Sequence, residues 1–350
     1  MKIGTWSSDS GRCYVIAEAG SNHDGKLEQA LALIDVAAEA RADAVKFQLF
    51  KASRMYPRNG GSVAYLSELG IDTPVYELVE KLELPDEWVP LLAEHAADRS
   101  IDFLVTPFDE EAVALLEPFV PAYKIASYEL THIPLILAAA RTGKPLILST
   151  GGATLAEVAA TVAAVRDKAS GMAILQCTAK YPAPLDRIDV RAIDDLAKAL
   201  DLPVGLSDHS QHPYFAPFAA VARGAVIVEK HFTLSRVLPG PDHSFAVEPN
   251  ELRDMVAGIR EIERALGEPK KRRRDVENEL ADYRRGIFTT SEVTTGSAFT
   301  RSNTAVLRRA GLPTTGLEPV DYPSVLRRTA SRALPAWHLL ARADLSEEGA

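Results

Sequence analysis

The chain has 350 residues, of which 47% are hydrophobic and 25% are charged, the balance of a globular protein with one large domain and a smaller one. Its formal net charge of −9 at pH 7 argues against a general role in binding nucleic acid. No apolar run reaches the roughly 18 residues that a membrane-spanning helix needs, so we expect no membrane partner.

The number and spacing of the cysteines indicate the cellular compartment. Cys13 and Cys177 are far apart and fit neither a disulfide framework nor a CxxC metal pattern, which is typical of a reducing environment. The first residues, MKIGTWSSDSGR, lack the apolar core of a signal peptide. We therefore expect a cytoplasmic protein.

Short apolar runs that alternate with longer segments predict β-strands. Several are almost continuously apolar (YVIAEAG, PLILST), as is typical of parallel strands that are buried on both faces. The predicted strands are Tyr14–Gly20, Ala44–Phe50, Phe103–Phe108, Ala122–Ser127, Pro145–Thr150, Met172–Thr178, Val204–Ser210 and Val226–Phe232.

Amphipathic patterns between these runs predict helices. Strands and helices in this alternation predict an α/β fold of the (β/α)₈ TIM-barrel class, with a doubly wound open sheet as the alternative. Residues 52–84 form a long strand-to-helix connection, which we expect to cover the catalytic face. The predicted helices are Leu27–Arg41, Pro85–Ala97, Glu110–Leu116, Leu155–Val165, Val190–Leu200, Tyr214–Arg223 and Glu251–Leu266.

The character of the chain changes after Leu266. Residues 267–284 are highly charged, and the basic run 270–274 is followed at once by acidic residues, so we interpret this segment as a solvated linker. From residue 285, short alternating segments with frequent Gly and Pro predict a small β-rich domain. The expected organisation is a barrel domain at 1–266, a linker at 267–284 and a small domain at 285–350.

Polar residues gather at the C-terminal halves of the predicted strands. A charged group in a buried strand is costly unless it is paired or bound to a ligand, and in a barrel these strand ends form the active-site face. A paired core ion is the alternative for any one residue, but their concerted placement favours a site. The residues are Glu18, Lys46, Gln48, Thr106, Lys124, Ser127, Ser149, Ser207, His209 and His231.

The residue types divide by chemical role. Two lysines and several hydroxyl groups suit the phosphate and carboxylate of one small ligand, because charge-assisted hydrogen bonds to anions are strong. Neither a GxxxxGK[ST] loop nor a GxGxxG turn is present, so no nucleotide site is indicated. His209 and His231 close neighbouring strands and can share one divalent metal ion, with positions left for water and substrate.

Motifs at these positions resemble the sialic acid synthase family (N-acetylneuraminate, legionaminate and pseudaminate synthases). They occur in family order and cover nearly all of the first 265 residues, and the tail from about residue 285 is similar to the family's small SAF (antifreeze-like) domain. The most specific motifs are VIAEAGSNHDG at 15–25, KFQ at 46–48, LSDHS at 206–210, and EKHFT at 229–233 with GPDH at 240–243.

The resemblance implies an enzyme that condenses phosphoenolpyruvate with a sugar aldehyde and releases phosphate. Glu18 and Gln48 would lie at the reacting centre, and His209 and His231 would bind a metal ion, usually Mn²⁺. The residues implied to hold phosphoenolpyruvate are Lys46, Thr106, Lys124, Ser127, Ser149 and Ser207.

The resemblance also implies a sugar site completed by a second subunit. Tyr181, Phe232 and Asp242 would face the sugar. In a domain-swapped homodimer the tail of one subunit would supply an arginine to the barrel of its partner, and Arg308 matches that position best, with Arg309 as the other possibility.

The identity of the sugar stays open at this point. N-acetylmannosamine, a di-N-acetylated 6-deoxy hexose and an unusual sugar of secondary metabolism all fit, with or without a phosphate group. Two other functions compete with the synthase: a metal-dependent barrel isomerase or aldolase that does not use phosphoenolpyruvate, and a non-catalytic sugar-binding protein.

Overall fold

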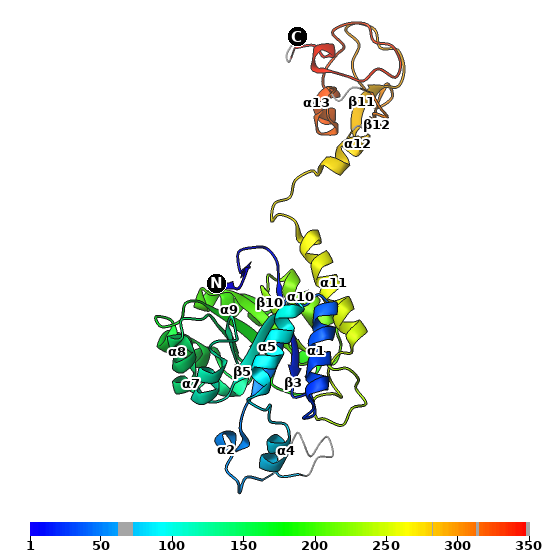
Figure 1. Ribbon diagram of the computed structural model, residues 1–350. Helices are drawn as coiled ribbons and strands as arrows, with labels where there is room; N and C mark the ends of the chain where they lie inside the picture. The colour runs from blue at the N-terminus through cyan, green and yellow to red at the C-terminus, as the bar shows by residue number, and fades with distance from the viewer. Residues whose placement is uncertain (62–72, 282, 313–314, 348–350) are drawn as a thin grey trace. The chain divides into compact units, whose positions relative to one another are not determined.

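The strands predicted from the apolar runs are all present in the computed structural model, which describes residues 1–61, 73–281, 283–312 and 315–347 (Figure 1). They are β3 (Tyr14–Gly20), β4 (Ala44–Leu49), β5 (Asp102–Pro107), β6 (Tyr123–Ile125), β7 (Leu146–Ser149), β8 (Met172–Cys177), β9 (Val204–Asp208) and β10 (Ile227–His231).

These strands form one eight-stranded sheet in the order β5-β4-β3-β10-β9-β8-β7-β6. Neighbouring strands pair in parallel, and the end strands β5 and β6 are in contact, so the sheet closes into a barrel. This confirms the predicted (β/α)₈ class.

Helices surround the barrel, and their bounds agree closely with the amphipathic patterns (Figure 1). The helix α7 was not predicted, because its sequence IPLILAAAR is a short apolar run that lacks a clear polar face. The helices are α1 (Leu27–Glu39), α5 (Trp88–Asp98), α6 (Glu110–Leu116), α7 (Ile133–Arg141), α8 (Leu155–Val165), α9 (Ala192–Leu200), α10 (Phe215–Ala222) and α11 (Pro249–Leu266).

The alternation of side chains along a strand divides the barrel into two buried regions. In β3, Val15 and Ala17 face the helices and join the main hydrophobic core. Tyr14 and Ile16 face the barrel interior, where they pack with Trp6 of a short N-terminal hairpin, β1 (Lys2–Ile3) and β2 (Trp6–Ser7). The next inward residue is Glu18. The interior is thus apolar at the N-terminal ends of the strands and polar at their C-terminal ends.

The long connection after β4 contains two short helices, α2 (Ala52–Met55) and α4 (Val75–Lys81). They contact each other and lie together beyond one end of the barrel (Figure 1). Residues 62–72 of this connection lie outside the described residues. Among the described ranges, no helix combines the length and the apolar character that crossing a membrane requires.

The chain divides into two compact units, Met1–Gly267 and Glu268–Ala350. In the second unit, β11 (Arg285–Thr289) and β12 (Thr304–Arg308) form an antiparallel pair. Its own core contains Ile287, Phe299 and Leu340 among other apolar residues.

Candidate active site

Charged side chains from four strands meet inside the barrel, in the polar region of its interior. They are Glu18 of β3, Lys46 of β4, Lys124 of β6 and Glu229 of β10, each no more than 4% exposed. The Lys46 Nζ atom lies 2.7 Å from Glu18 Oε2 and 3.9 Å from Glu229 Oε2. The Lys124 Nζ atom lies 3.5 Å from Glu229 Oε1. Both lysines are therefore compensated by carboxylates, as buried charge requires.

Hydroxyl groups from three further strands complete this network. Lys46 Nζ donates a hydrogen bond to Thr106 Oγ1 of β5 at 2.8 Å, and Lys124 Nζ donates to Ser149 Oγ of β7 at 2.7 Å. Ser207 of β9 donates to the carboxylate that the two lysines share, at 3.1 Å. The structure thus brings together all but one of the residues expected to hold phosphoenolpyruvate.

Ser127, the remaining member of that set, follows β6 and contacts the loop after β7. Its Oγ accepts a hydrogen bond from the Gly151 N–H group at 3.0 Å. A Cβ atom on Gly151 would lie 2.9 Å from that oxygen and 2.8 Å from the Ala179 Cβ atom. Glycine at 151 therefore allows this loop to approach Ser127 closely.

Glu18 and Glu229, the two carboxyl groups of the network, differ in pKa. Burial raises the pKa of Glu18 to about 7, and the neighbouring Glu229 adds to the rise while Lys46 opposes it. Burial also favours the protonated form of Glu229, but Lys124 and Lys46 together outweigh it, so the pKa of Glu229 falls below its usual range. Glu18 can therefore exchange a proton near neutral pH, whereas Glu229 stays charged.

Gly20 has no side chain, so Asp242 can lie close to Glu18 and Gln48. Gly20 has a φ of +54°, and a Cβ atom there would lie 3.2 Å from Asp242 Oδ2 and 3.5 Å from both Gln48 Nε2 and Glu18 Oε1. Gln48 Nε2 donates a hydrogen bond to Glu18 Oε1 at 2.8 Å. Burial raises the pKa of Asp242 to about 6. The predicted reacting groups and a predicted sugar contact thus lie in one place.

The two predicted metal ligands also lie side by side. The ring centroids of His209 and His231 are 5.5 Å apart. His209 Nδ1 lies 3.0 Å from the carbonyl oxygen of Thr178, so this nitrogen donates its proton there and the lone pair is on Nε2, which lies 3.9 Å from Cys177 Sγ. Burial lowers the pKa of His209 to about 4, and burial together with His209 lowers the pKa of His231 well below its usual range. Both rings are neutral at pH 7.

This arrangement fits a divalent metal ion. His231 Nδ1 is buried and lacks a hydrogen-bond partner among the described residues, as expected for a nitrogen that awaits a ligand. The hydrogen bond from His209 to a backbone carbonyl is the kind that orients metal-binding histidines. In the described part of the chain no group of three or more His, Cys, Asp or Glu side chains could hold a metal. A cation held by the two imidazoles would have coordination positions left for water and substrate.

Tyr181 connects the histidines to a cavity. Its ring stacks on His209 with centroids 4.1 Å apart and meets His231 edge-on at 5.7 Å. Tyr181 and His231 line a cavity of about 170 Å³ together with Gln48 and Asp242. Most of the remaining lining comes from the connection that contains α2 and α4. In the structure this connection adjoins the candidate site, as its length predicted.

One residue expected at the sugar lies elsewhere, which corrects that prediction. Phe232 is fully buried and packs in the core between the sheet and the helices. Glu229 and His231 point into the barrel, so the alternation of the strand turns Lys230 and Phe232 outward. Lys230 accordingly pairs with Asp208 at 2.7 Å and stabilises the loop after β9.

The structure also distinguishes the two arginines. Arg309 is 2% exposed, and its guanidinium group lies 3.0 Å from Glu318 Oε1 within the second unit. Arg309 is therefore held within its own unit, which favours Arg308 as the arginine that contacts the sugar. Arg308, the last residue of β12, is exposed.

Glu229 contacts both lysines and Ser207, whereas the sequence had suggested it only as a carboxylate near the two histidines. The alternation of β10 was the available signal, because it places Glu229 on the same face as His231.

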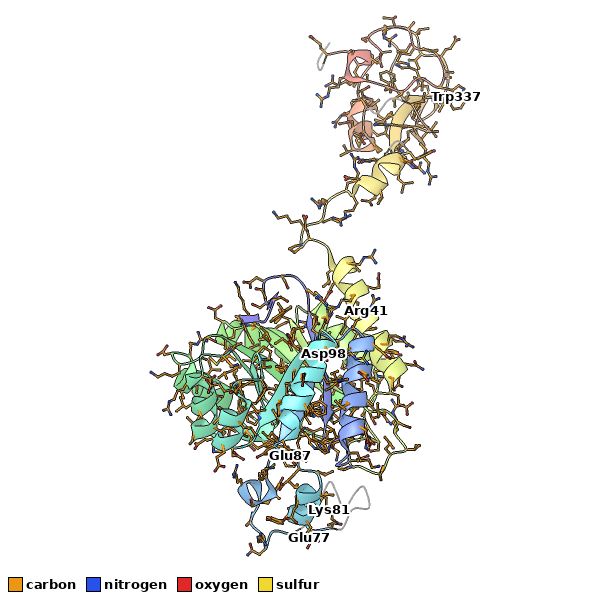
Figure 2. All side chains as sticks on the ribbon, in the orientation of Figure 1. Arg41, Glu77, Lys81, Glu87, Asp98 and Trp337 are labelled. Atoms are coloured by element: carbon orange, nitrogen blue, oxygen red, sulfur yellow. The ribbon has the colours of Figure 1, made fainter. Side chains whose placement is uncertain are left out.

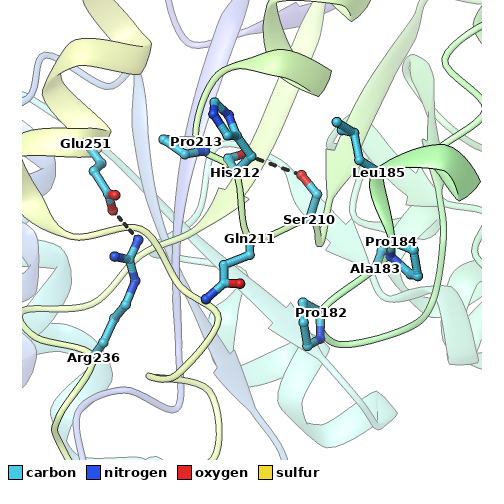
Figure 3. Close-up of a pocket in the computed structure, with 10 residues that line it drawn as sticks. All are labelled: Pro182, Ala183, Pro184, Leu185, Ser210, Gln211, His212, Pro213, Arg236 and Glu251. Atoms are coloured by element: carbon cyan, nitrogen blue, oxygen red, sulfur yellow. Dashed lines mark hydrogen bonds and ion pairs between the residues drawn. The ribbon is translucent and has the colours of Figure 1, made fainter.

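A larger cavity of about 550 Å³ lies between the loops after β8 and β9 (Figure 3). Its lining includes Pro182, Leu185 and Gln211, with the ion pair of Arg236 and Glu251 on one side. None of the predicted site residues lines it, so its size does not make it the candidate active site.

The comparison with protein families identifies the family of this chain. The NeuB family model matches residues 33–271. The chain belongs to the NeuB family. Enzymes of this family are phosphoenolpyruvate-dependent synthases, which confirms the predicted enzyme class.

Named relatives of this NeuB-family chain agree with that assignment. The spore coat polysaccharide biosynthesis protein SpsE of Bacillus subtilis is 45% identical over 323 residues, covering 87% of this chain and 86% of that protein. The N,N'-diacetyllegionaminic acid synthase of Campylobacter jejuni is 36% identical, covering 91% and 96%. The crystal structure of the sialic acid synthetase of Leptospira borgpetersenii matches with a TM-score of 0.72 at 33% identity, covering 81% and 95%.

Proposed function

We propose that this NeuB-family enzyme condenses phosphoenolpyruvate with a sugar aldehyde of the N-acetylmannosamine kind. The product would be a nine-carbon α-keto acid of the sialic acid type, and inorganic phosphate would be released. One observation carries the proposal: the network around Lys46 and Lys124 adjoins a cavity that is lined by His231 and Gln48.

The network suits phosphoenolpyruvate because this ligand has a phosphate and a carboxylate within a few ångströms of each other. Lys46 and Lys124, with the hydroxyl groups of Thr106, Ser149 and Ser207, provide charged and neutral donors for both groups.

The proposed reaction forms a carbon–carbon bond and a carbon–oxygen bond to water, breaks the carbon–oxygen bond to phosphate, and leaves the aldehyde oxygen protonated as a hydroxyl group. C3 of phosphoenolpyruvate attacks the aldehyde carbon, water adds at C2, and the tetrahedral intermediate expels phosphate. Glu18 would accept a proton from this water, and the hydrogen bond from Gln48 at 2.8 Å would hold its carboxylate in place. The fixed lysines stabilise charge on the phosphate and carboxylate without reorganisation.

We further propose that His209 and His231 hold a divalent cation, with Mn²⁺ the expected metal. Imidazole nitrogen with carboxylate and water nearby suits the harder transition metals. When bound there, such a cation acts as a Lewis acid toward the aldehyde. Tyr181 and the carbonyl group of Thr178 fix the orientation of the His209 ring.

We propose that the second unit is the family's SAF domain and that the protein acts as a cytoplasmic, domain-swapped homodimer. Arg308 is the residue proposed to reach the sugar site of the partner. Its exposure at the end of β12 supports this role, whereas Arg309 is committed to Glu318.

The test is phosphate release by the purified full chain with phosphoenolpyruvate, Mn²⁺ and a panel of sugar aldehydes. Release that depends on both the sugar and the metal is expected, with one keto acid formed per phosphate. Conversion of the sugar in the absence of phosphoenolpyruvate would favour an isomerase or aldolase. Sugar binding that needs no metal and survives His209→Ala would favour a non-catalytic binding protein.

A further inference from the structure

A further cavity, of about 470 Å³, lies at the N-terminal ends of the barrel strands. Tyr14 of β3, Asp102 of β5 and Trp6 of the N-terminal hairpin line it. Tyr14 and Trp6 also belong to the apolar cluster that fills this end of the barrel interior. Glu18 and Thr106 of the candidate active site follow Tyr14 and Asp102 four residues later on the same strands, about 13 Å away. The cavity is therefore separate from the candidate active site.

The charged side chains that line this cavity are three arginines, Arg12, Arg41 and Arg99, and two aspartates, Asp43 and Asp102. Arg12 Nη2 lies 2.6 Å from Asp43 Oδ1. Arg99 pairs through its Nε atom with a carboxylate outside the lining, at 2.7 Å, and its two terminal nitrogen atoms have no partner in the described part of the chain. Positive charge therefore exceeds negative charge in this lining.

Arg41 is the most available of these cations. Its side chain is exposed and forms no ion pair or hydrogen bond with any residue that the structure describes. Figure 2 shows it at the end of the barrel remote from Glu77 and Lys81 of α4. Arg41 follows α1 with a φ of +60°, a backbone conformation that favours glycine. A charged side chain retained at a strained position indicates that the side chain has a role.

Hydrogen-bonding groups accompany the arginines. The hydroxyl groups of Thr5 and Ser100 line the cavity and have no hydrogen-bond partner among the described residues. The Tyr14 hydroxyl group donates to Asp102 Oδ2 at 2.6 Å, so Asp102 Oδ1 is left to accept a hydrogen bond from a ligand. A cavity of this volume is in the range of sites that bind small molecules.

We propose that this cavity binds a small hydroxyl-rich metabolite through an oxyanion group, a phosphate or a carboxylate. The guanidinium groups of Arg41 and Arg99 donate charge-assisted hydrogen bonds to the oxyanion. Asp102 Oδ1 accepts a hydrogen bond from a hydroxyl group of the same ligand. Because the cavity is remote from the reacting groups, this ligand is not a reactant, and the inference does not depend on the proposed function.

Isothermal titration calorimetry of the full chain tests the inference, with glucose 6-phosphate, glucuronate and inorganic phosphate as probes. We expect at least one of the two sugar derivatives to bind more tightly than inorganic phosphate, and which of them binds distinguishes a phosphate ligand from a carboxylate ligand. Arg41→Gln should weaken this binding by about tenfold or more, because hydrogen bonds to charged groups are among the strongest. Arg141→Gln is the matched control, since Arg141 is an exposed arginine at the end of α7 outside the cavity lining.

A structural role for Arg41 makes a different prediction. If Arg41 served to stabilise the C-terminal end of α1 through its charge, Arg41→Gly would lower the temperature of thermal unfolding. We expect this variant to lose the binding without a lower unfolding temperature, because glycine suits the φ of +60°.

Four results would overturn the inference. They are the absence of binding with all three probes, binding of inorganic phosphate alone, unchanged binding in both Arg41 variants, and loss of binding in Lys124→Gln with retention in Arg41→Gln. The last result would place the anion in the lysine network of the candidate active site. Because no outcome is measured as phosphate release, a failed synthase assay would leave this test unaffected.

Discussion

The Nζ atom of Lys46 and the Oε2 atom of Glu18 lie 2.7 Å apart inside the barrel, where the parallel register of β3 and β4 pairs the two residues directly. A lysine at this distance normally holds the pKa of a carboxyl group low. Burial and the nearby Glu229 nevertheless raise the pKa of Glu18 to about 7. The barrel interior therefore keeps one carboxyl group able to bind or release a proton at neutral pH.

Replacing Glu18 by glutamine should lower kcat by roughly 10²- to 10⁴-fold, the usual contribution of a positioned proton acceptor. Because the carboxylate form exists above its pKa, the wild-type rate should fall as pH drops below about 7. The variant should lose this inflection. Steady-state kinetics between pH 5.5 and 8.5 would measure it, with Glu28→Gln on the exposed face of α1 as the control. A Glu18→Gln protein with the wild-type profile would remove Glu18 from the chemistry.

Loss of either imidazole should weaken metal binding. His209→Ala and His231→Ala are each expected to reduce Mn²⁺ affinity by about 100-fold or more, because a single protein ligand remains. Titration calorimetry or the electron paramagnetic resonance of free Mn²⁺ would measure this loss without an activity assay. His212→Ala is the matched control, since His212 stacks on Phe215. Equal affinity in all three variants would place the metal elsewhere.

The neighbouring arginines of the second unit should respond in opposite ways. Arg309→Ala removes the buried guanidinium group that pairs with the partly exposed carboxylate of Glu318. We therefore expect the free energy of unfolding of that unit to fall by about 2 kcal/mol. Arg308→Ala should leave thermal unfolding nearly unchanged but should raise the KM for the sugar. Calorimetry and kinetics on the same two preparations separate the effects. Full activity in Arg308→Ala would contradict its proposed contact with the partner.

His23 should make the barrel sensitive to acid. Burial lowers its pKa to about 4 from the usual histidine value of 6.5, so between these values the unfolded chain binds a proton that the folded chain does not. The free energy of unfolding should therefore decrease as pH falls from 6.5 to 4, by up to about 3 kcal/mol from this residue. Urea unfolding of His23→Gln should show a flatter dependence. The exposed His132→Gln should behave as wild type, and a wild-type slope in His23→Gln would refute the assignment.

The fold was readable from the sequence because parallel strands that are buried on both faces leave nearly continuous apolar runs. Tyr14–Gly20 was placed without error for that reason. Leu155–Val165 was predicted from its amphipathic pattern, and in the structure a Thr154–Glu157 capping box begins this helix. The helix at 133–141 was missed, since a short apolar run looks alike whether it forms a strand or a buried helix.

The direction of individual side chains was harder to predict. Strict alternation in β10 would have separated Glu229 and His231, which point inward, from Lys230 and Phe232, which point outward. The burial of Arg309 could not have been predicted in this way. It depends on Glu318 and on carbonyl groups several residues away, which become neighbours only when the second unit has folded.

The apolar packing of Tyr14 and Ile16 with Trp6 closes the barrel at the N-terminal ends of its strands. Lys46 and Glu229 lie one inward position closer to this seal than Gln48 and His231. Because the barrel is closed at these ends, ligands reach its interior from the C-terminal ends of the strands. If phosphoenolpyruvate binds at the deeper position, as proposed, it would enter before the aldehyde and phosphate would leave last, so turnover would follow a compulsory order.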